Sequence, residues 1–198
     1  MIKAIFFDLD GVLVDACDWH FHSLNDSLRH FKGIEISYAE HLDKFNGLPT
    51  SVKLQMLGLD AQEQKKIWQM KQDKTLDNIR KFGQKDKYKI KMLDSLKKEG
   101  YTLVCVTNSI RETATEMLNI TGQLPFFDKL ITNEDVSNNK PHPDCYLLAM
   151  SLFSLKKEEC LIVEDSPKGK QAAYASGGKV LEVEDIYDVT LDNLRRII

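Results

Sequence analysis

Three features that would mark a specialised class of protein are missing from this sequence of 198 residues. No apolar run approaches the roughly 18 residues of a membrane span, and the first residues carry no signal-peptide pattern, so we expect no membrane partner. Neither sign of charge is in large excess, and a net charge of −3 gives no reason to expect a nucleic-acid partner. The four cysteines form no close pair and no metal-ligand spacing. We therefore expect a protein of the reducing cytoplasm.

What remains is the composition of an ordinary globular protein. Apolar residues make up 42% of the chain and charged residues 29%, both typical values. The length suits one large domain, or one domain that carries an inserted module. Cys105 and Cys160 lie inside apolar runs, which indicates that they are small core residues.

The start of the chain combines a buried strand with two carboxylates. Ile2–Phe7 is a short apolar run of β-branched and aromatic residues, which predicts a strand buried on both faces. Asp8 and Asp10 follow, and residues two apart in an extended chain point the same way, so both carboxylates can share one small volume. They repel each other unless a cation or a shared proton lies between them, which suggests Mg²⁺. Gly11 permits a sharp turn, and a plain strand-to-turn junction is the alternative interpretation.

Residues from about 15 to 85 predict only helices, because apolar residues recur at helical intervals and no strand pattern occurs. The many lysines in the last part of this stretch are expected to form a solvated face. Helices are expected over 18–31, 38–45, 49–57 and 61–82.

After a polar linker at 83–87, strands and helices alternate, which argues for a parallel sheet with helices on both faces. The helical stretch is thus inserted between the first strand and the rest of the sheet. A last helix is expected over 191–198. Further strands are expected over 101–106, 129–132, 160–163 and 179–183.

Polar side chains follow the first, second and fourth predicted strands, and parallel strands would bring them to one edge of the sheet. Carboxylates there can hold Mg²⁺, while hydroxyls, backbone N–H groups and a lysine can hold a phosphoryl group. A carboxylate that faces phosphorus can also attack it, and a second carboxylate can move a proton. The side chains are Asp8, Asp10, Thr107, Asn108, Ser109, Glu164 and Asp165, with Lys140 in the loop after the third strand.

Each of these elements has a plainer interpretation when it is taken alone. Thr107 and Ser109 can be the caps of the next helix. Lys140 can be an ordinary solvated lysine, and 164–166 can be a strand end followed by a cap. Because four such coincidences follow successive strands in the right order, we favour a functional site.

With these motifs in this order, the sequence resembles the haloacid dehalogenase-like (HAD) phosphohydrolase superfamily, closest to its β-phosphoglucomutase and phosphoglycolate phosphatase-like members. The resemblance covers essentially the whole chain. It implies an α/β fold in which a Rossmann-like parallel sheet core, 1–14 and 86–198, carries an inserted small α-helical cap domain, 15–85. The matching motifs are Asp8-Leu9-Asp10-Gly11-Val12, Val106-Thr107-Asn108-Ser109, Lys140-Pro141-His142-Pro143-Asp144 and Val163-Glu164-Asp165-Ser166.

The resemblance also implies a role for each site residue, with Mg²⁺ as cofactor and a small phosphorylated metabolite as substrate. Asp8 is expected to be the nucleophile and a metal ligand. Asp10 is expected to be the general acid/base, with its backbone carbonyl on the metal. Lys140 would neutralise charge on the phosphoryl group. Substrate binding falls to Thr107, Asn108, Ser109 and the cap residue His20, and the metal site is completed by Glu164 and Asp165.

The motifs favour a phosphatase over the alternatives. Dehalogenases of the superfamily typically lack the second carboxylate, Asp10, and the small residues of β-phosphoglucomutases are replaced here by the phosphatase-like segment 106–109. His20 occurs in mutases and in many phosphatases, and it can also be a plain polar residue of a cap helix. Where related mutases have an arginine after the cap glycine, this chain has 47–51, with Lys53 as the nearest cation.

We therefore predict a monomeric phosphatase that forms an aspartyl phosphate. A sugar-phosphate mutase is the first alternative, and a non-catalytic sensor of phosphorylated metabolites is the second. The cap would select the substrate. Candidate residues for this selection, from position alone, are Trp19, His20, Asn46, Leu48 and Lys53.

Overall fold

The computed structural model describes all residues, 1–198, and its centre is a five-stranded parallel sheet in the order β3-β2-β1-β4-β5. The central strand β1 pairs with β2 and β4, so that Phe7 lies opposite Cys105 on one side and Val163 on the other. The carboxyl ends of these three strands are therefore neighbours, and the predicted α/β class is confirmed. The strands are β1 Ala4–Phe7, β2 Thr102–Val106, β3 Lys129–Ile131, β4 Cys160–Glu164 and β5 Lys179–Glu182.

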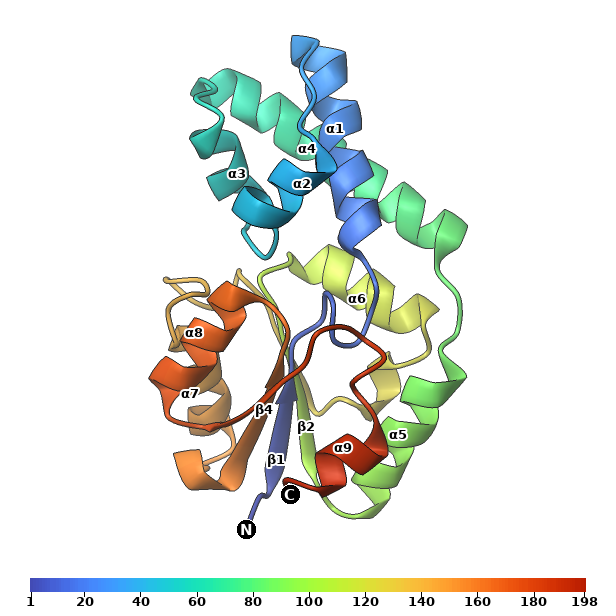
Figure 1. The fold of residues 1–198 in the computed structure, drawn as a ribbon, viewed down its shortest axis with the longest axis vertical. Helices are drawn as coiled ribbons and strands as arrows, with labels where there is room; N and C mark the ends of the chain where they lie inside the picture. The colour runs from blue at the N-terminus through green and yellow to red at the C-terminus, as the bar shows by residue number, and fades with distance from the viewer.

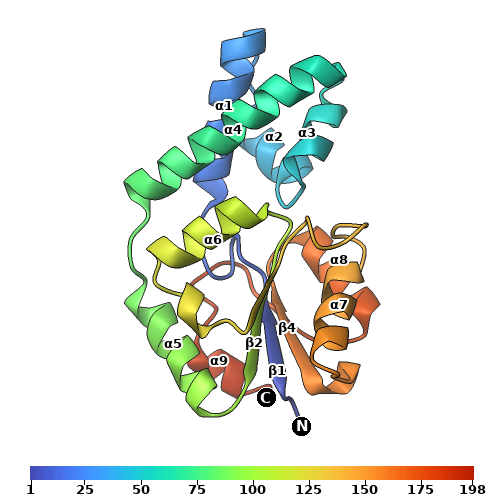
Figure 2. The ribbon, with the colours of Figure 1, turned by 180° about the vertical axis from the view of Figure 1, so that it is seen from behind.

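Helices cover both faces of the sheet, as the alternating pattern predicts. Helices α5, α6 and α9 lie against one face, and α7 and α8 lie against the other (Figure 1 and, from behind, Figure 2). The last helix ends at Arg195, three residues before the predicted end. Short 3₁₀ turns span Leu124–Phe126 and Lys157–Glu159. The helices are α5 Lys87–Lys98, α6 Arg111–Ile120, α7 Asp144–Leu152, α8 Pro167–Ser176 and α9 Leu191–Arg195.

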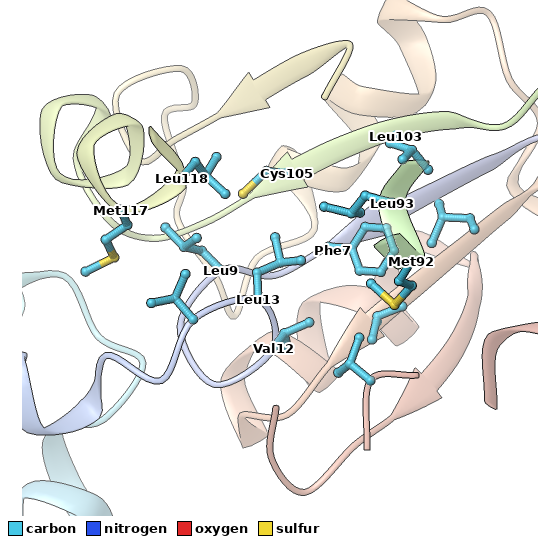
Figure 3. Close-up of a cluster of buried hydrophobic side chains, with 14 of the residues drawn as sticks. Phe7, Leu9, Val12, Leu13, Met92, Leu93, Leu103, Cys105, Met117 and Leu118 are labelled. Carbon is cyan, nitrogen blue, oxygen red and sulfur yellow. The ribbon is translucent and has the colours of Figure 1, made fainter. Parts of the chain in front are cut away.

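Alternate residues of β1 enter two separate apolar cores. Ile5 and Phe7 join the larger core beneath α5, α6 and α9, while Ala4 and Phe6 join the core beneath α7 and α8. All four side chains are fully buried, which confirms the prediction of a strand covered on both faces. Figure 3 shows Phe7 among Met92, Leu93 and Leu103 in the larger core. Cys105 and Cys160 are also fully buried, as predicted.

Four helices and a π-helical turn stand above the carboxyl ends of the strands (Figure 1). They enclose an apolar core of their own, made of Leu24, Leu28, Ile36, Phe45, Leu54 and Ile67. No helix in the chain combines the length and the apolar composition needed to span a membrane. The elements are α1 Cys17–Lys32, α2 Tyr38–Glu40, the π-helical turn His41–Phe45, α3 Thr50–Met56 and α4 Ala61–Phe82.

Local sequence explains where the two long helices of this layer begin and end. Gly33 takes φ of 67° directly after α1, and a left-handed residue of this kind ends a helix at little steric cost. Asp60 caps α4 through the N–H groups of Gln62 and Glu63, and the Glu63 carboxylate in turn accepts from the backbone of Asp60. Both helices therefore match the ranges that periodicity predicts to within one or two residues.

Candidate active site

Asp8 lies at the end of β1 and is 7% exposed. Its Oδ1 accepts a hydrogen bond of 2.9 Å from Lys140 Nζ, across 132 residues of sequence. Burial raises the pKa of Asp8 well above its usual value, and Glu164 raises it further, whereas Lys140 lowers it. An anionic Asp8 thus depends on positive charge beside it.

Lys140 is 4% exposed, so the interpretation as a solvated lysine is wrong. Its ammonium group donates three hydrogen bonds: to Asp8 Oδ1, to Val106 O at 2.8 Å and to Glu164 Oε1 at 2.5 Å. Glu164 Oε1 also accepts a hydrogen bond of 2.6 Å from the hydroxyl of Tyr146. Tyr146 is a fully buried residue of α7 that the motifs do not indicate. Glu164 and Tyr146 therefore fix the position of the lysine that faces Asp8.

Three carboxylates converge at the ends of β1 and β4. Ligand oxygens of Asp8, Glu164 and Asp165 lie within 4.8 Å of one another. Asp165 Oδ1 is buried without a hydrogen-bond partner, and burial together with Glu164 raises the pKa of Asp165 to about 7. Mutual repulsion and an unpartnered buried oxygen fit a hard divalent cation that takes oxygen ligands.

Gly11 makes this convergence possible in two ways. Its φ of 84° is a conformation that favours glycine, and a Cβ at this position would lie 2.2 Å from Asp165 Oδ2. The turn after Asp10 therefore needs both the backbone freedom of glycine and the space that a side chain would fill.

Asp10 faces away from that cluster, toward the cap. Its Oδ1 lies 2.9 Å from Nε2 of His20 on α1, and its Oδ2 accepts a hydrogen bond of 2.9 Å from the hydroxyl of Ser109. Burial by itself would raise the pKa of Asp10, but His20 and the hydrogen bonds from His20 and Ser109 outweigh burial, so the pKa is lowered. The side chain of Asp10 is not part of the carboxylate cluster, so a metal contact from this residue would use its backbone carbonyl.

The partners of His20 define its protonation. Its Nε2 faces the carboxylate of Asp10, which can only accept, so the proton is on Nε2 and Nδ1, 3.1 Å from Nζ of Lys71 on α4, is the acceptor. Burial and Lys71 lower the pKa of His20 to about 4, which leaves the ring neutral near pH 7. Both ring nitrogens are thus engaged within the protein, so this side chain orients Asp10. Lys71 is 4% exposed, so the prediction of a solvated lysine face is wrong at this position.

The segment after β2 uses its side chains in ways that the sequence does not reveal. Ile110, not Ser109, is the residue that precedes α6, and Thr107 Oγ1 accepts from the N–H of Ser109 at 3.0 Å. The interpretation of Thr107 and Ser109 as helix caps is therefore wrong. Ser166, by contrast, does cap α8, since its hydroxyl accepts from the N–H of Gly169 at 3.1 Å.

The amide group of Asn108 joins the cap to the core. Its Nδ2 donates to Gly47 O at 2.9 Å and to Lys140 O at 3.2 Å, and its Oδ1 accepts from Lys140 N at 3.1 Å. The side chain is thereby committed to protein partners. The backbone N–H of Asn108 makes no hydrogen bond within the protein and remains a donor for an anion next to Asp8.

A cavity of about 70 Å³ lies between the strand ends and the cap. It is lined by four of the five cap positions named from sequence alone, namely His20, Asn46, Leu48 and Lys53. Trp19 does not line it and packs instead against the apolar core beneath α6. Several lining residues carry no motif signal: Thr50, Ser51, Trp68, Lys71, Gln72 and Asn133.

A parallel sheet whose central strand ends in two carboxylates, with a buried lysine and further carboxylates from neighbouring strands, defines a phosphohydrolase of the α/β class. The chain belongs to the haloacid dehalogenase-like hydrolase family, whose family model matches residues 5–183. The resemblance seen in the motifs is thus confirmed over most of the chain.

Relatives with assigned activities cover most of the chain as well. A protein of Bacillus velezensis named pyrophosphatase PpaX is 30% identical over 190 residues, which span 92% of this chain and 83% of the relative. A phosphorylated carbohydrates phosphatase of Thermotoga maritima is 26% identical over 95% of this chain and 85% of its own. These names place the chain among enzymes that hydrolyse phosphate groups.

The fold is shared with solved structures. The crystal structure of β-phosphoglucomutase from Clostridium difficile matches with a TM-score of 0.85 at 20% identity, over 99% of this chain and 96% of that one. At this identity the similarity concerns the fold alone.

Proposed function

We propose that this protein is a Mg²⁺-dependent phosphatase that hydrolyses a small phosphorylated metabolite through an aspartyl phosphate. The observation that carries the proposal is the opposite orientation of Asp8 and Asp10. Asp8 faces Lys140 and the carboxylate cluster, whereas Asp10 faces His20 and Ser109. Two neighbouring carboxylates with different environments suit two different roles.

In the first step, an oxygen of Asp8 attacks phosphorus and forms the acyl phosphate bond. The bond from phosphorus to the leaving oxygen breaks, and that oxygen takes a proton from Asp10. Lys140 balances charge on the transferring group, and the free N–H of Asn108 and the hydroxyl of Thr107 are donors for its oxygens.

In the second step, water attacks the phosphorus of the aspartyl phosphate and Asp10 takes the proton of that water. The acyl phosphate bond breaks, which releases phosphate and restores Asp8 as a carboxylate. His20 and Ser109 hold Asp10 beside the cavity during both proton transfers.

The proposed metal ligands are Asp8 and Asp165 through their side chains and Asp10 through its backbone carbonyl. Glu164 already accepts hydrogen bonds from Lys140 and Tyr146, so its contribution to the metal would be indirect. A bound Mg²⁺ would offset the repulsion between an anionic nucleophile and an anionic phosphate.

We propose residues 15–85 as a cap domain that closes over a core of 1–14 and 86–198. Closure would exclude bulk water from the cavity, and contacts such as Asn108 to Gly47 O link the two parts. Four free cysteines fit a reducing compartment, and we expect a cytoplasmic monomer.

The test is phosphate release from inorganic pyrophosphate, sugar phosphates, phosphoglycolate and nucleotides, with Mg²⁺ and with EDTA. Pyrophosphate belongs in the panel because relatives are named pyrophosphatase. Mg²⁺-dependent release that Asp8→Asn lacks is the expected result. Isomer formation with a bisphosphate activator and no net release would indicate a mutase. Binding of phosphorylated ligands without turnover by any route would indicate a sensor.

A further inference from the structure

The two connections between the core and the helices above it meet at one place, the C-terminal end of α6. Gly83 follows α4 and lies against this end: a Cβ at position 83 would be 2.4 Å from Cγ2 of Ile120, the last residue of α6. Further along, the N–H of Asp86 donates a hydrogen bond of 3.0 Å to the carbonyl of Thr121. The segment from α4 to α5 is thus fixed to the end of α6, which lies beneath α4 (Figure 2).

The other connection is fixed two residues further on, by the side chain of Gln123. Its Nε2 donates a hydrogen bond of 3.0 Å to the carbonyl of Leu13, across 110 residues of sequence. Gln123 is fully buried, and the Leu13 carbonyl accepts no other hydrogen bond within the protein. Because a carbonyl can only accept, this contact also defines which end of the Gln123 amide is the donor.

Leu13 lies between the turn that carries Asp10 and the linker to the cap. The N–H groups of Leu13 and Val14 each donate a hydrogen bond of 2.9 Å to Leu9 O. The N–H of Gly11 donates a further one of 2.8 Å to Val14 O, so the turn closes around Asp10. Helix α1 of the cap begins only three residues after Val14. A pull on the linker by a moving cap would therefore reach the backbone of Asp10 unless Leu13 is held.

The energetics of Gln123 indicate a role other than stability. Its Oε1 is buried without a hydrogen-bond partner, which costs free energy. An apolar side chain of similar size would remove this unpartnered oxygen and would leave the Leu13 carbonyl unpartnered instead. Because these two changes oppose each other, the amide contributes little to the stability of the fold. Its distinct effect is to hold Leu13.

We infer that Gln123 is a positioning residue, which keeps the turn that carries Asp10 in place while the cap moves. This inference rests on the proposed function, in which Asp10 transfers protons and the cap closes. Gln123 does not line the cavity, so it acts only through the backbone of the turn. Because Asp10 moves a proton in both steps, a displaced turn should slow turnover more than it weakens substrate binding.

Two apolar variants, Gln123→Met and Gln123→Leu, remove the donor and nearly keep the volume of the side chain. Each should lower kcat by about tenfold or more, change KM by less than about threefold, and leave the melting temperature within about 3 °C of the wild type. Hydrogen–deuterium exchange of residues 9–16 should become about tenfold faster or more, while exchange of the edge strand β5 stays unchanged. Gln62→Met, at an exposed position of α4, is the matched control and should change nothing.

Three results would overturn the inference. The first is a wild-type kcat in both variants, and the second is unchanged exchange of residues 9–16 in both. The third is a melting temperature that falls by more than about 10 °C in both variants, because Gln123 would then be an ordinary structural residue of the core.

Hydrogen–deuterium exchange also separates this inference from the proposed function, because it needs no turnover. If the wild type releases no phosphate from any substrate, the phosphatase fails, and faster exchange of residues 9–16 in both variants still supports the anchor at Leu13. If the wild type releases phosphate and both variants match its kcat, the phosphatase stands and the role of Gln123 fails.

Discussion

His20 Nε2 of the cap donates to Asp10 Oδ1 of the core at 2.9 Å. The bond joins the proposed general acid/base to α1, a helix that follows it in sequence and lies above the carboxyl ends of the strands (Figure 1). The protonation of Asp10 is thereby coupled to the position of the cap. Several measurements can detect this coupling and the other contacts of the site.

The first prediction concerns the pH dependence of turnover. His20→Ala removes a hydrogen bond that favours the ionised form of Asp10, so the pKa of Asp10 should rise. Because Asp10 must be protonated to give a proton to the leaving oxygen in the first step, which kcat/KM reports, the basic limb of kcat/KM should move to higher pH. The pH–rate profile measures this shift, and exposed His22→Ala is the control. An unchanged limb would contradict the coupling.

The second prediction concerns the nucleophile. Asp8→Asn should lower kcat by at least about 10⁴-fold, because the amide lacks the anionic oxygen that attacks phosphorus. The fold should persist, since burial and Glu164 disfavour the carboxylate of Asp8 in the native state. Phosphate release and thermal unfolding are measured together, with exposed Asp15→Asn as control. Retention of near wild-type turnover by Asp8→Asn would exclude the aspartyl phosphate route.

The third prediction concerns the hydroxyl of Tyr146. Tyr146→Phe removes the hydrogen bond to Glu164 Oε1 and should lower the free energy of unfolding by about 1.5–3 kcal/mol, because the acceptor is a carboxylate and both side chains are fully buried. Tyr174→Phe removes a hydrogen bond to Glu182 at the surface and should lower it by much less, because solvent screens that contact. Urea unfolding of both variants compares the two. Equal losses would show that burial does not strengthen the Tyr146 contact.

The fourth prediction concerns stability and pH at Lys53. Its folded-state pKa of about 8 lies below the ordinary value of 10.5, so the unfolded chain holds the proton more tightly. The ammonium therefore destabilises the fold fully below pH 8, and this effect fades as the pH rises toward 10.5. Lys53→Met should raise the free energy of unfolding at pH 7 by on the order of 1–3 kcal/mol, and the difference should shrink near pH 10.

Lys89→Met provides the contrast for that experiment. Lys89 is buried too, but it donates to two backbone carbonyls, which would be left without a donor. This variant should therefore be destabilised at pH 7. Urea unfolding at pH 7 and pH 10 follows both variants. If Lys53→Met were as destabilising as Lys89→Met, Lys53 would have a structural partner after all.

The fifth prediction concerns metal removal. Mg²⁺ should raise the melting temperature of the wild type relative to EDTA, because a ligand that binds only the native state stabilises it. Asp165→Ala should abolish most of this rise, since it removes the unpartnered oxygen of the carboxylate cluster. Asp77→Ala, an exposed carboxylate of α4, should retain the rise. Equal Mg²⁺ responses of wild type and Asp165→Ala would place the ion elsewhere.

Periodicity and strand-end motifs predict most of the elements and their parallel arrangement. The helix predicted over 38–45 is an exception, since it is the short α2 followed by the π-helical turn His41–Phe45. The helix predicted over 61–82 is α4 residue for residue, because apolar spacing and the Asp60 cap are both local features. The clusters after β1, β2 and β4 meet at one edge because parallel pairing leaves no other place for them. Local pattern and sheet geometry therefore determined the fold and the position of the site.

The tertiary structure alone decided how individual side chains are used. Lys71 is 51 residues from His20 in sequence, and Lys53 is a cap lysine with no local signal of burial, yet both face the cavity. Ser109 donates to Asp10 instead of capping α6, and Tyr146 supports Glu164 from another helix. Such contacts depend on which atoms meet when distant segments pack. The sequence of one segment alone therefore does not identify the residue that it will contact.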